Sequence, residues 1–160
     1  MVVMPPHPDP TYNVRLDPAD QCDAHHRAIV IFMRIDRIDH LVLTVADLDA
    51  AIDFYTRVLG MEAVSFGDGR QALAFGHSKI NLHRAGHEFE PKAEHALPGT
   101  ADLCLIAATP IEQVVEELTE HGVPIEEGPV ERTGATGPLL SVYLRDPDRN
   151  LIEISNPRRA

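Results

Sequence analysis

The amino-acid sequence predicts an α+β fold in which two βαβββ modules are paired and form a curved mixed sheet. The first observation is an internal repeat: aligned without a gap, His40 falls on Asp102 at the start of a strand-like segment. The second is that each of these segments precedes a predicted helix that stops at a glycine, Gly60 or Gly122, as helix C-termini often do. The third is that three further strand-like segments follow each helix. The same order of elements is therefore predicted twice.

The first module is predicted to span about residues 34–97. Its first strand, residues 35–45, is rich in Val, Ile, Leu and Thr, which favour half-buried pleated strands. Asp47 is a good N-cap for the helix predicted over residues 48–59, whose apolar residues recur at helical spacing. Three short strands are then expected, over residues 61–66, 70–75 and 78–83. A polar connection over residues 84–99 is long enough to cross between the modules or over a site.

The second module is predicted over about residues 98–157. A strand over residues 101–107 leads to Thr109-Pro110-Ile111-Glu112, which has the pattern of a capping box with proline at the tolerated first helical position. This helix is expected to stop at Gly122. The segment over residues 128–138 is predicted to be a glycine-rich loop. The remaining strands are expected over residues 124–127, 139–144 and 151–155.

Residues 1–33 differ from the rest of the chain. The proline-dense segment over residues 4–10 cannot form a helix or a central strand, so residues 1–33 are predicted to be a flexible N-terminal extension. Four residues with metal-binding side chains lie in it: Cys22, Asp23, His25 and His26. Their spacing matches no closed metal site, so they are interpreted as part of a solvated tail.

The composition limits the classes of partner. A chain of 160 residues with 44% hydrophobic residues is long enough for one ordinary domain or two small fused modules. A formal net charge of −11 argues against non-specific binding to nucleic acid or to anionic membranes. Cys22 and Cys104 are far apart and indicate no disulfide framework, and Cys104 is expected to be a reduced, buried thiol. The apolar run over residues 28–33 is too short to span a membrane, so a soluble, cytoplasmic protein is predicted.

The repeat identifies four equivalent polar positions as candidates for a site. His40 falls on Asp102 in the first strands, and Asn81 falls on Glu153 in the last strands. His83 lies two residues after Asn81, and strand residues two apart share a face. If the modules pack into one curved sheet, these side chains converge in a cleft. Imidazole and carboxylate ligands suit a divalent metal ion: Zn, Ni, Mn, Co or non-haem Fe(II).

Each of these residues also has an ordinary structural interpretation. His40 and Asp102 could be polar residues at strand starts, and His83 could be a surface residue at a strand end. Asn81 could hydrogen-bond to the sheet or to a substrate. Glu153 lies between two isoleucines, where a buried carboxylate requires a partner, and this favours a role as a metal ligand.

Several motifs resemble those of a known family. Asp39–Val45 followed by Ala51–Gly60 resembles the opening of vicinal oxygen chelate proteins, and Arg145–Ser155 resembles their closing motif. This family includes glyoxalase I, fosfomycin and bleomycin resistance proteins, methylmalonyl-CoA epimerase and extradiol dioxygenases. The middle of the chain resembles the glyoxalase domain-containing protein 5 branch, over residues 79–83, 88–93, 101–104 and 130–137. The resemblance covers about residues 34–157.

The resemblance implies paired modules, a homodimer and a divalent metal ion whose ligands come from the first and last strands of each module. His40 and Glu153 match the family's ligands directly. Asn81 stands where glyoxalase I has Glu, and Asp102 stands where glyoxalase I and the extradiol dioxygenases have His. Arg149 stands where the closing motif usually has Gly. These departures distinguish the chain from both enzyme types.

The metal is expected to be held by His40, Glu153 and a third ligand, His83 or Asp102. It would act as a Lewis acid on two adjacent substrate oxygens. Glu153 or Asp102 would then move a proton between neighbouring carbons as the catalytic base. His83 is the preferred third ligand, because it supplies the second imidazole that the family has at another position.

Arg132 and Thr133, on the predicted glycine-rich loop, are expected to bind the substrate together with Asn81. The preferred function is a metal-dependent glyoxalase-like lyase or isomerase that acts on a small oxygenated substrate. Two alternatives remain open from the sequence. One is a ring-cleaving Fe(II) dioxygenase, and the other is a non-catalytic small-molecule-binding protein that resembles the bleomycin resistance proteins.

Overall fold

The computed structural model describes residues 33–158. The predicted N-terminal extension therefore lies outside the described residues, as do Cys22, Asp23, His25 and His26. The chain divides into two units, Met1–Asp36 and Arg37–Ala160, and every described helix and strand belongs to the second. No helix within residues 33–158 is both long enough and apolar enough to cross a membrane.

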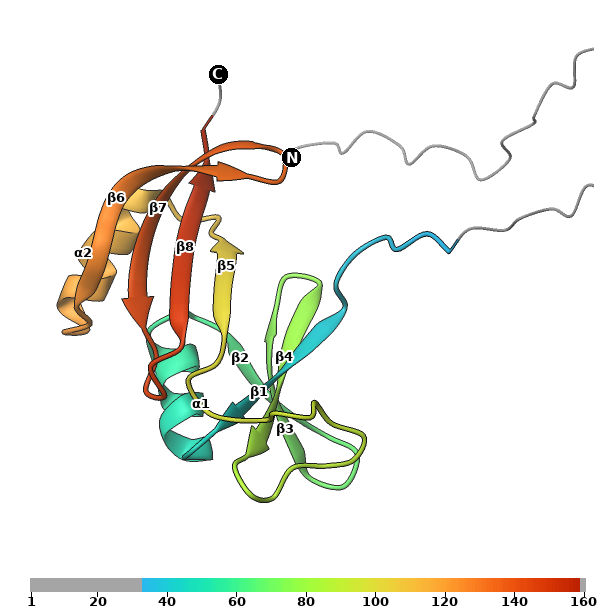
Figure 1. The fold of residues 1–160 in the computed structure, drawn as a ribbon. Helices are drawn as coiled ribbons and strands as arrows, with labels where there is room; N and C mark the ends of the chain where they lie inside the picture. The colour runs from blue at the N-terminus through green and yellow to red at the C-terminus, as the bar shows by residue number, and fades with distance from the viewer. Residues whose placement is uncertain (1–32, 159–160) are drawn as a thin grey trace, which may run out of the picture. The chain divides into compact units, whose positions relative to one another are not determined.

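The first module contains one strand, one helix and three strands, in the predicted order (Figure 1). These are β1 (His40–Val45), α1 (Leu48–Arg57), β2 (Glu62–Phe66), β3 (Arg70–Phe75) and β4 (Ser78–Arg84). The strands form a four-stranded sheet in the order β1-β4-β3-β2. β1 pairs with β4 in parallel, and the other neighbours pair antiparallel. The parallel pair is joined by a crossover that contains α1.

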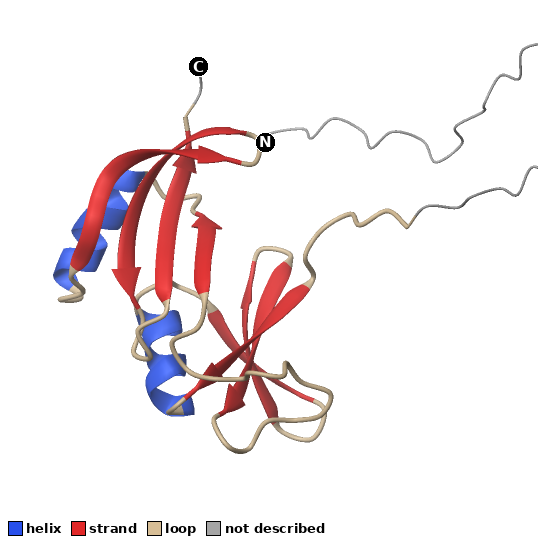
Figure 2. Ribbon diagram, viewed as in Figure 1, coloured by secondary structure: helices blue, strands red, loops and turns tan. Residues whose placement is uncertain are grey.

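The second module repeats this arrangement (Figures 1 and 2). Its elements are β5 (Asp102–Ile106), α2 (Ile111–Glu120), β6 (Ile125–Gly134), β7 (Gly137–Arg145) and β8 (Leu151–Pro157). The sheet order is β5-β8-β7-β6, again with one parallel pair, β5 and β8. The predicted α+β fold of paired βαβββ modules is therefore confirmed. The curved sheet takes the form of two four-stranded mixed sheets in residues 33–158.

The strand registers reproduce the repeat that was found in the sequence. In the first sheet, Asn81 of β4 lies opposite Val42 of β1. In the second sheet, Glu153 of β8 lies opposite Cys104 of β5. Cys104 is the residue that the gapless alignment places on Val42. Asn81 and Glu153 consequently occupy equivalent positions in their two sheets.

Helix α1 begins at the predicted residue, Leu48, and ends at Arg57, two residues before the predicted end. The Asp47 side chain accepts hydrogen bonds from the backbone N–H groups of Asp49 and Ala50, at 2.9 and 3.0 Å. These bonds satisfy two donors that an uncapped helix would leave free. At the other end, Gly60 has a φ of +66°, a left-handed conformation that glycine adopts without steric cost.

Helix α2 begins differently from the prediction. Its N-cap is Pro110, which makes no side-chain capping bond. The prediction of a capping box that begins at Thr109 is therefore wrong. Thr109 lies one residue too early for its hydroxyl group to reach the first turn. The turn is held instead by Asn156 of β8, whose side-chain N–H groups donate to the carbonyls of Ala107 and Thr109 at 2.9 and 3.0 Å.

The predicted glycine-rich loop is also wrong, because most of it is strand. β6 continues through Gly134 and pairs with β7 as a hairpin whose turn is Ala135-Thr136. Gly134 lies opposite Gly137, and Thr133 lies opposite Pro138. Pairing with β7 satisfies the backbone groups that a loop would expose to water. Residues 128–134 are thus part of the second sheet.

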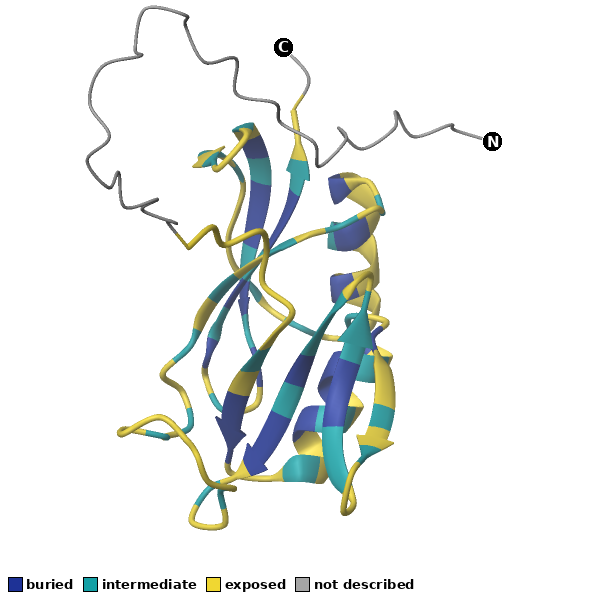
Figure 3. Ribbon diagram, turned by 90° about the vertical axis from the view of Figure 1, so that its right-hand side faces the viewer, coloured by how far each residue is buried: buried dark blue, intermediate teal, exposed yellow. Residues whose placement is uncertain are grey.

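Each helix covers one face of the sheet in its own module, and a continuous cluster of buried apolar side chains runs through both modules. The helices contribute Ala51, Phe54, Tyr55, Ile111, Val114 and Leu118. Figure 3 shows how buried and exposed residues alternate along the strands. The alternation arises because successive strand side chains point to opposite faces. One face of each sheet therefore packs against a helix, and the other is left open.

Two contacts link the first module to the connection between β7 and β8. The buried phenol of Tyr55 on α1 donates a hydrogen bond to Asp146, with 2.9 Å between the oxygens. The backbone N–H of Ala46 donates to Asp148 at 3.0 Å. Burial raises the pKa of Tyr55, and the negative charge of Asp146 raises it further, so the phenol remains a donor. In both contacts, a carboxylate of the second module accepts a hydrogen bond from the first module.

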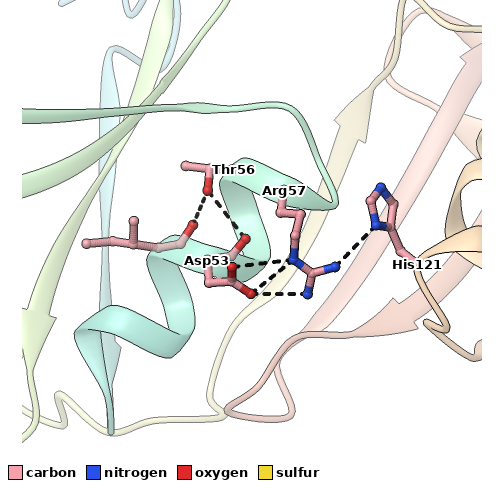
Figure 4. Close-up of polar contacts among 5 residues, drawn as sticks. Asp53, Thr56, Arg57 and His121 are labelled. Atoms are coloured by element: carbon pink, nitrogen blue, oxygen red, sulfur yellow. Dashed lines mark hydrogen bonds and ion pairs between the residues drawn. The ribbon is translucent and has the colours of Figure 1, made fainter.

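A third contact between the modules lies at the surface (Figure 4). Arg57, at the end of α1, pairs with Asp53 one turn earlier, at 3.1 Å. Its guanidinium also lies 3.2 Å from Nδ1 of His121, which caps the end of α2. Exposed contacts of this kind contribute little stability, so the buried Tyr55 contact is the stronger link.

Candidate functional site

The open faces of the two sheets carry the polar residues that the sequence nominated. In β1, Leu41, Leu43 and Val45 pack into the core, so His40 and Val42 point to the open face. The same alternation places Lys79, Asn81 and His83 of β4 on that face. In the second sheet, the open face carries Asp102, Cys104, Ser141, Tyr143, Glu153 and Ser155. Each sheet therefore presents its own group of polar side chains.

His40 lies at the start of β1, and its side chain is exposed. Its Nδ1 lies 2.8 Å from a carboxylate oxygen of Asp39. This contact lowers the pKa of Asp39 by hydrogen bonding. A histidine that gives one ring nitrogen to a carboxylate has its other nitrogen oriented and available, which is the usual arrangement in metal-binding histidines.

Asn81 and His83 lie two residues apart on β4, and one polar atom of each side chain is inaccessible to water. Asn81 Oδ1 and His83 Nδ1 have no hydrogen-bond partner among the described residues. The His83 ring packs edge-on against Phe89, with 5.3 Å between ring centres. Burial lowers the pKa of His83, and the nearby Arg70 lowers it further, so the imidazole is neutral at pH 7.

Glu153 is the centre of a hydrogen-bonded cluster on the second sheet. The Ser155 hydroxyl donates to a Glu153 carboxylate oxygen at 3.1 Å, and Ser141 Oγ lies 2.8 Å from Ser155 Oγ. Burial raises the pKa of Glu153, but hydrogen bonds from the Ser141, Ser155, Tyr143 and Cys104 side chains outweigh burial and lower it. Glu153 is therefore a carboxylate at neutral pH that sits on an open face.

Cys104 belongs to this cluster, and the prediction that it is buried is wrong. It is exposed, and its Sγ lies 3.4 Å from Ser155 Oγ. The apolar residues on either side of it, Leu103 and Leu105, point into the core. Cys104 therefore points outward. Alternate residues of a strand point to opposite faces of the sheet, so an apolar strand can still place every second residue outside the core. The sequence did not show that the face carrying Cys104 is not covered by a helix.

Asp102 lies at the start of β5, opposite Leu151 of β8. Glu153 is two residues further along β8, on the same face. His40 and Asn81 stand in the same diagonal relationship in the first sheet, since His40 lies opposite Lys79. The four equivalent positions thus form two diagonal pairs, one in each sheet.

Arg132 and Thr133 lie on β6 rather than on a loop, and they point in opposite directions. Arg132 donates to the Tyr143 phenol oxygen at 3.0 Å and to Glu127 at 2.6 Å. Tyr143 lies opposite Glu153 in the sheet, so Arg132 connects to the Glu153 cluster through Tyr143. Thr133 is exposed and is not part of this cluster.

Sequence reasoning missed four members of the Glu153 cluster: Cys104, Ser141, Tyr143 and Ser155. The signal that could have found Ser141 and Tyr143 is the alternation in Leu139–Arg145, where every second residue is polar on one face. Finding Cys104 would have required the pairing of β5 with β8, which is a tertiary feature.

The three predicted metal ligands do not meet within one chain. His40 lies opposite Lys79, whereas His83 lies opposite Thr44, four residues further along the sheet. At about 3.3 Å per residue, four residues separate the two histidines by roughly 13 Å. Both point from the same face, so they cannot share an ion whose ligand nitrogens lie about 2 Å away. The register therefore places His83 apart from His40 in the first sheet, and the ligand set itself stays a prediction.

Glu153 lies on the other sheet from both histidines. Among residues 33–158, no three His, Cys, Asp or Glu side chains come together in a group that could hold a metal ion. Among the described residues, a single chain thus carries two separate groups of polar side chains, one on each sheet. The first carries His40 and Asn81, and the second carries Asp102 and Glu153 with its hydroxyl donors.

This fold, with a polar group on the open face of each sheet, is typical of one class of protein. The chain belongs to the Glyoxalase/Bleomycin resistance protein/Dioxygenase superfamily, whose family model matches residues 37–154. The matched segment includes all described elements from β1 into β8. Family membership confirms the broader resemblance that the opening and closing motifs indicated.

Particular relatives are similar over most of the chain. Virulence protein STM3117 of Salmonella typhimurium is 60% identical over 131 residues, which cover 82% of this chain and 90% of the relative. Its crystal structure matches with a TM-score of 0.78 and covers 79% of this chain and 100% of that chain. Glyoxalase domain-containing protein RDO1 of Mycosarcoma maydis is 56% identical over 124 residues, covering 78% of this chain and 70% of the relative.

A more distant structural neighbour has an activity in its name. The crystal structure of lactoylglutathione lyase from Agrobacterium tumefaciens is 25% identical, with a TM-score of 0.60. The match covers 77% of this chain and 95% of that chain. These similarities agree with the observed α+β fold and with its paired modules.

Proposed function

We propose that this protein is a glyoxalase-like lyase or isomerase that moves a proton within a small oxygenated substrate. The observation that carries the proposal is the environment of Glu153, a carboxylate kept ionised by hydroxyl donors on an open sheet face. The similarity to a lactoylglutathione lyase supports the reaction class. The motif resemblance to the glyoxalase domain-containing protein 5 branch adds to the proposal.

In this proposal Glu153 is the catalytic base. Its carboxylate accepts a proton from a carbon next to a carbonyl group and returns it to the neighbouring carbon. Ser155 and Ser141 hold the carboxylate in place through their hydroxyl chain. Tyr143, which Arg132 binds at 3.0 Å, presents a polar group beside the reacting atoms. Asn81, on the other sheet, belongs to the substrate-binding surface.

The family implies a divalent metal ion, and the chemistry of the donor set fits one. We propose His40, Asp102 and Glu153 as its ligands, because the Asp39 contact orients His40 and because Glu153 is ionised. An imidazole and two carboxylates suit Zn, Ni, Mn, Co or Fe(II). When bound, the ion would supply Lewis-acid polarisation of substrate oxygens. His83 is too far from His40 along the sheet to be part of this set.

The proposed ligands lie on two sheets that one chain does not join into a three-ligand group within residues 33–158. We therefore propose a homodimer in which the first sheet of one copy faces the second sheet of the other. Two features support it. Apolar side chains are exposed on both open faces, Val42 at 47% and Ile106 at 58%. In addition, β1 and β5 are edge strands of their sheets.

The location is part of the proposal as well. An acidic chain with two cysteines that are far apart in the sequence supports a reducing, cytoplasmic environment. A small molecule is the proposed ligand, and the net charge of −11 disfavours nucleic acid and anionic membranes as partners.

Proton exchange tests the proposed reaction. The protein is loaded with each metal and given hemithioacetals and hydroxyketones in deuterium oxide, and NMR follows exchange at the carbon next to the carbonyl. Glu153→Gln is expected to lower the exchange rate by about 100-fold or more, the usual contribution of a positioned base. Glu116→Gln, an exposed carboxylate on α2, is the matched control and should leave the rate unchanged. Substrate binding without exchange in the wild-type protein would overturn the enzyme proposal.

Metal content and oligomeric state test the second part. Elemental analysis and light scattering are run on the same sample, for the wild-type protein and for Val42→Asp. Placing a charge on the exposed Val42 is expected to give a monomer that has lost most of its metal. A monomeric wild-type protein with one tightly bound ion would contradict the shared site.

A further inference from the structure

We propose that the open face of the first sheet holds a subsite for a small hydroxycarboxylate, formed by Arg70, Lys79, Asn81 and His83. The subsite names a substrate class and rests on the proposed function, because it lies on the same face as His40. Three observations carry it: two buried polar atoms without partners among the described residues, two cations without carboxylate partners there, and the partly exposed Phe89 ring that packs on His83 and Arg70.

The first observation is the pair of unpartnered atoms. Asn81 Oδ1 and His83 Nδ1 are both shielded from water and have no hydrogen-bond partner among residues 33–158. His83 as a whole is only 8% exposed. Polar atoms buried in this way are rare and costly, so a ligand that supplies the missing partners would bind favourably. Both atoms lie on one face of β4, two residues apart, within reach of one small molecule.

The second observation is the positive charge beside these atoms. Lys79 precedes Asn81 by two residues on the same face. Its Nζ lies 3.9 Å from the centre of the Phe66 ring, and Phe66 lies opposite Arg70, so the long Lys79 side chain extends along the sheet toward Arg70. The Arg70 guanidinium lies 4.4 Å from the centre of the Phe89 ring. Neither cation forms an ion pair within the part of the chain that the structure describes. In a protein with a net charge of −11, two such cations form a local site for an anion.

The carboxylate whose charge acts on His83, Glu88, does not neutralise this site. Glu88 accepts from Lys92 Nζ at 2.8 Å and from the backbone N–H of Gly86 at 2.8 Å. Its charge is thus already balanced on its own loop. Arg70 is left to bind a ligand carboxylate through its paired N–H groups.

The two observations together define the ligand. The amide oxygen of Asn81 is an acceptor and requires a hydroxyl donor. Arg70 and Lys79 require an oxyanion, and the neutral His83 ring can pair with a second ligand oxygen. A small acid with a hydroxyl group next to its carboxylate meets all three requirements. A simple carboxylate would leave Asn81 Oδ1 unpaired.

Phe89 is the cover of the subsite. It lies in the connection between β4 and β5, is 38% exposed, and packs on His83 on one side and Arg70 on the other. Because the ring packs on His83, it must turn aside for a ligand to reach this histidine. An exposed aromatic side chain on a loop can do this without disturbing the sheet.

Calorimetric titration with lactate and propionate tests the subsite, because the two acids differ by one hydroxyl group. Lactate is expected to bind the wild-type protein about tenfold more tightly than propionate, the usual effect of one buried hydrogen bond. Asn81→Leu should remove this difference by weakening lactate alone. Arg70→Gln should weaken both acids. Asn81→Asp is the second variant, and its carboxylate should weaken both by repulsion even if Asn81→Leu folds poorly.

Arg84→Gln is the matched control. Arg84 is an exposed cation at the end of β4, opposite Val45, and alternation directs it away from the open face. Its variant should bind lactate as the wild-type protein does. Equal affinity of the wild-type protein for lactate and propionate would overturn the proposal. Inorganic phosphate that binds as tightly as lactate, without dependence on Asn81, would overturn it in favour of a plain anion site.

Glu153→Gln separates this inference from the proposed reaction. Glu153 lies on the second sheet and supplies no group to the subsite, so in the metal-free protein this variant should keep the preference for lactate over propionate, whereas the metal-loaded variant should lose proton exchange. Normal proton exchange in a wild-type protein that does not prefer lactate would overturn the subsite and leave the reaction standing. A wild-type protein that prefers lactate but shows no proton exchange would overturn the proposed reaction and leave the subsite standing.

Discussion

Tyr55 of the first module and Asp146 of the second are joined by a buried hydrogen bond of 2.9 Å between the phenol and the carboxylate. Asp146 also accepts from the backbone and side chain of Asn150, each at 2.8 Å. Asn150 in turn accepts from the backbone N–H of Ala101, directly before β5. A single buried chain of polar contacts therefore fixes α1 against the turn that leads into β8, the strand of Glu153.

Removing this link should destabilise the protein. Tyr55→Phe keeps the ring but leaves Asp146 with one donor fewer, and losing a hydrogen bond to a buried charged group costs about 1.5–3 kcal/mol. Denaturant unfolding monitored by circular dichroism measures the free energy of unfolding. Tyr143→Phe, on the open face of β7, is the control and should change that free energy by less. An equal loss in both variants would contradict the special role of Tyr55.

The sequence predicted the first module better than the second, for a local reason. Asp47 and Gly60 are signals that act within a few residues, and α1 begins and ends next to them. Gly134 and Gly137 are ambiguous, because glycines occur in loops and also beside tight hairpin turns. Only the pairing of β6 with β7 decides between the two, and that pairing is not encoded in the segment itself.

The candidate site was predictable in part for the same reason. The repeat identified Asn81 and Glu153 as equivalent because the first and last strands of both modules pair in the same register. It could not show that His83 lies four residues along the sheet from His40, since β4 returns to β1 only in the folded chain. Nor could it show that the hydroxyl donors of Ser141 and Ser155 surround Glu153.

Gly128 should be among the least replaceable glycines. Its φ is +108°, and an added Cβ would collide with the backbone carbonyl of Ser141 in β7. Gly128→Ala is therefore expected to cost roughly 3 kcal/mol or more, from backbone strain and from displacement of β7. Gly67→Ala is the matched control, because Gly67 has a φ of +52° but nothing within 4 Å of the added atom. It should cost about 1–2 kcal/mol. Thermal unfolding of both variants compares them directly.

The Ser155 hydroxyl should help to set the ionisation of Glu153. Ser155→Ala removes a donor at 3.1 Å and breaks the contact with Ser141, so the pKa of Glu153 should rise. A carbon-detected NMR titration of the Glu153 carboxyl group measures the change. Ser65→Ala, on β2 in the first sheet, should leave this pKa where it is. If the pKa of Glu153 stays constant in Ser155→Ala, the hydrogen bonds from Ser141, Tyr143 and Cys104 are sufficient to keep it low.

His83 should make the stability of the protein fall as the pH drops below about 6.5. Burial and Arg70 lower its pKa in the folded state, so the unfolded chain binds a proton at a higher pH than the folded chain does. Stability rises with pH wherever the unfolded state holds more protons, so the contribution is complete above the unfolded pKa of about 6.5 and is lost toward the folded pKa.

The neighbouring charged groups modify this effect without reversing it. Lys92 lowers the pKa of His83 as Arg70 does, and Glu88 raises it less than burial lowers it. The hydrogen bond from Lys92, together with backbone hydrogen bonds such as that from Gly86, lowers the pKa of Glu88 to about 2, so Glu88 keeps its charge between pH 5 and 7. Unfolding free energies of the wild-type protein and His83→Gln, measured from pH 5 to 7.5, should differ in slope only below about pH 6.5. If the wild-type slope persists in His83→Gln, the slope belongs to another histidine.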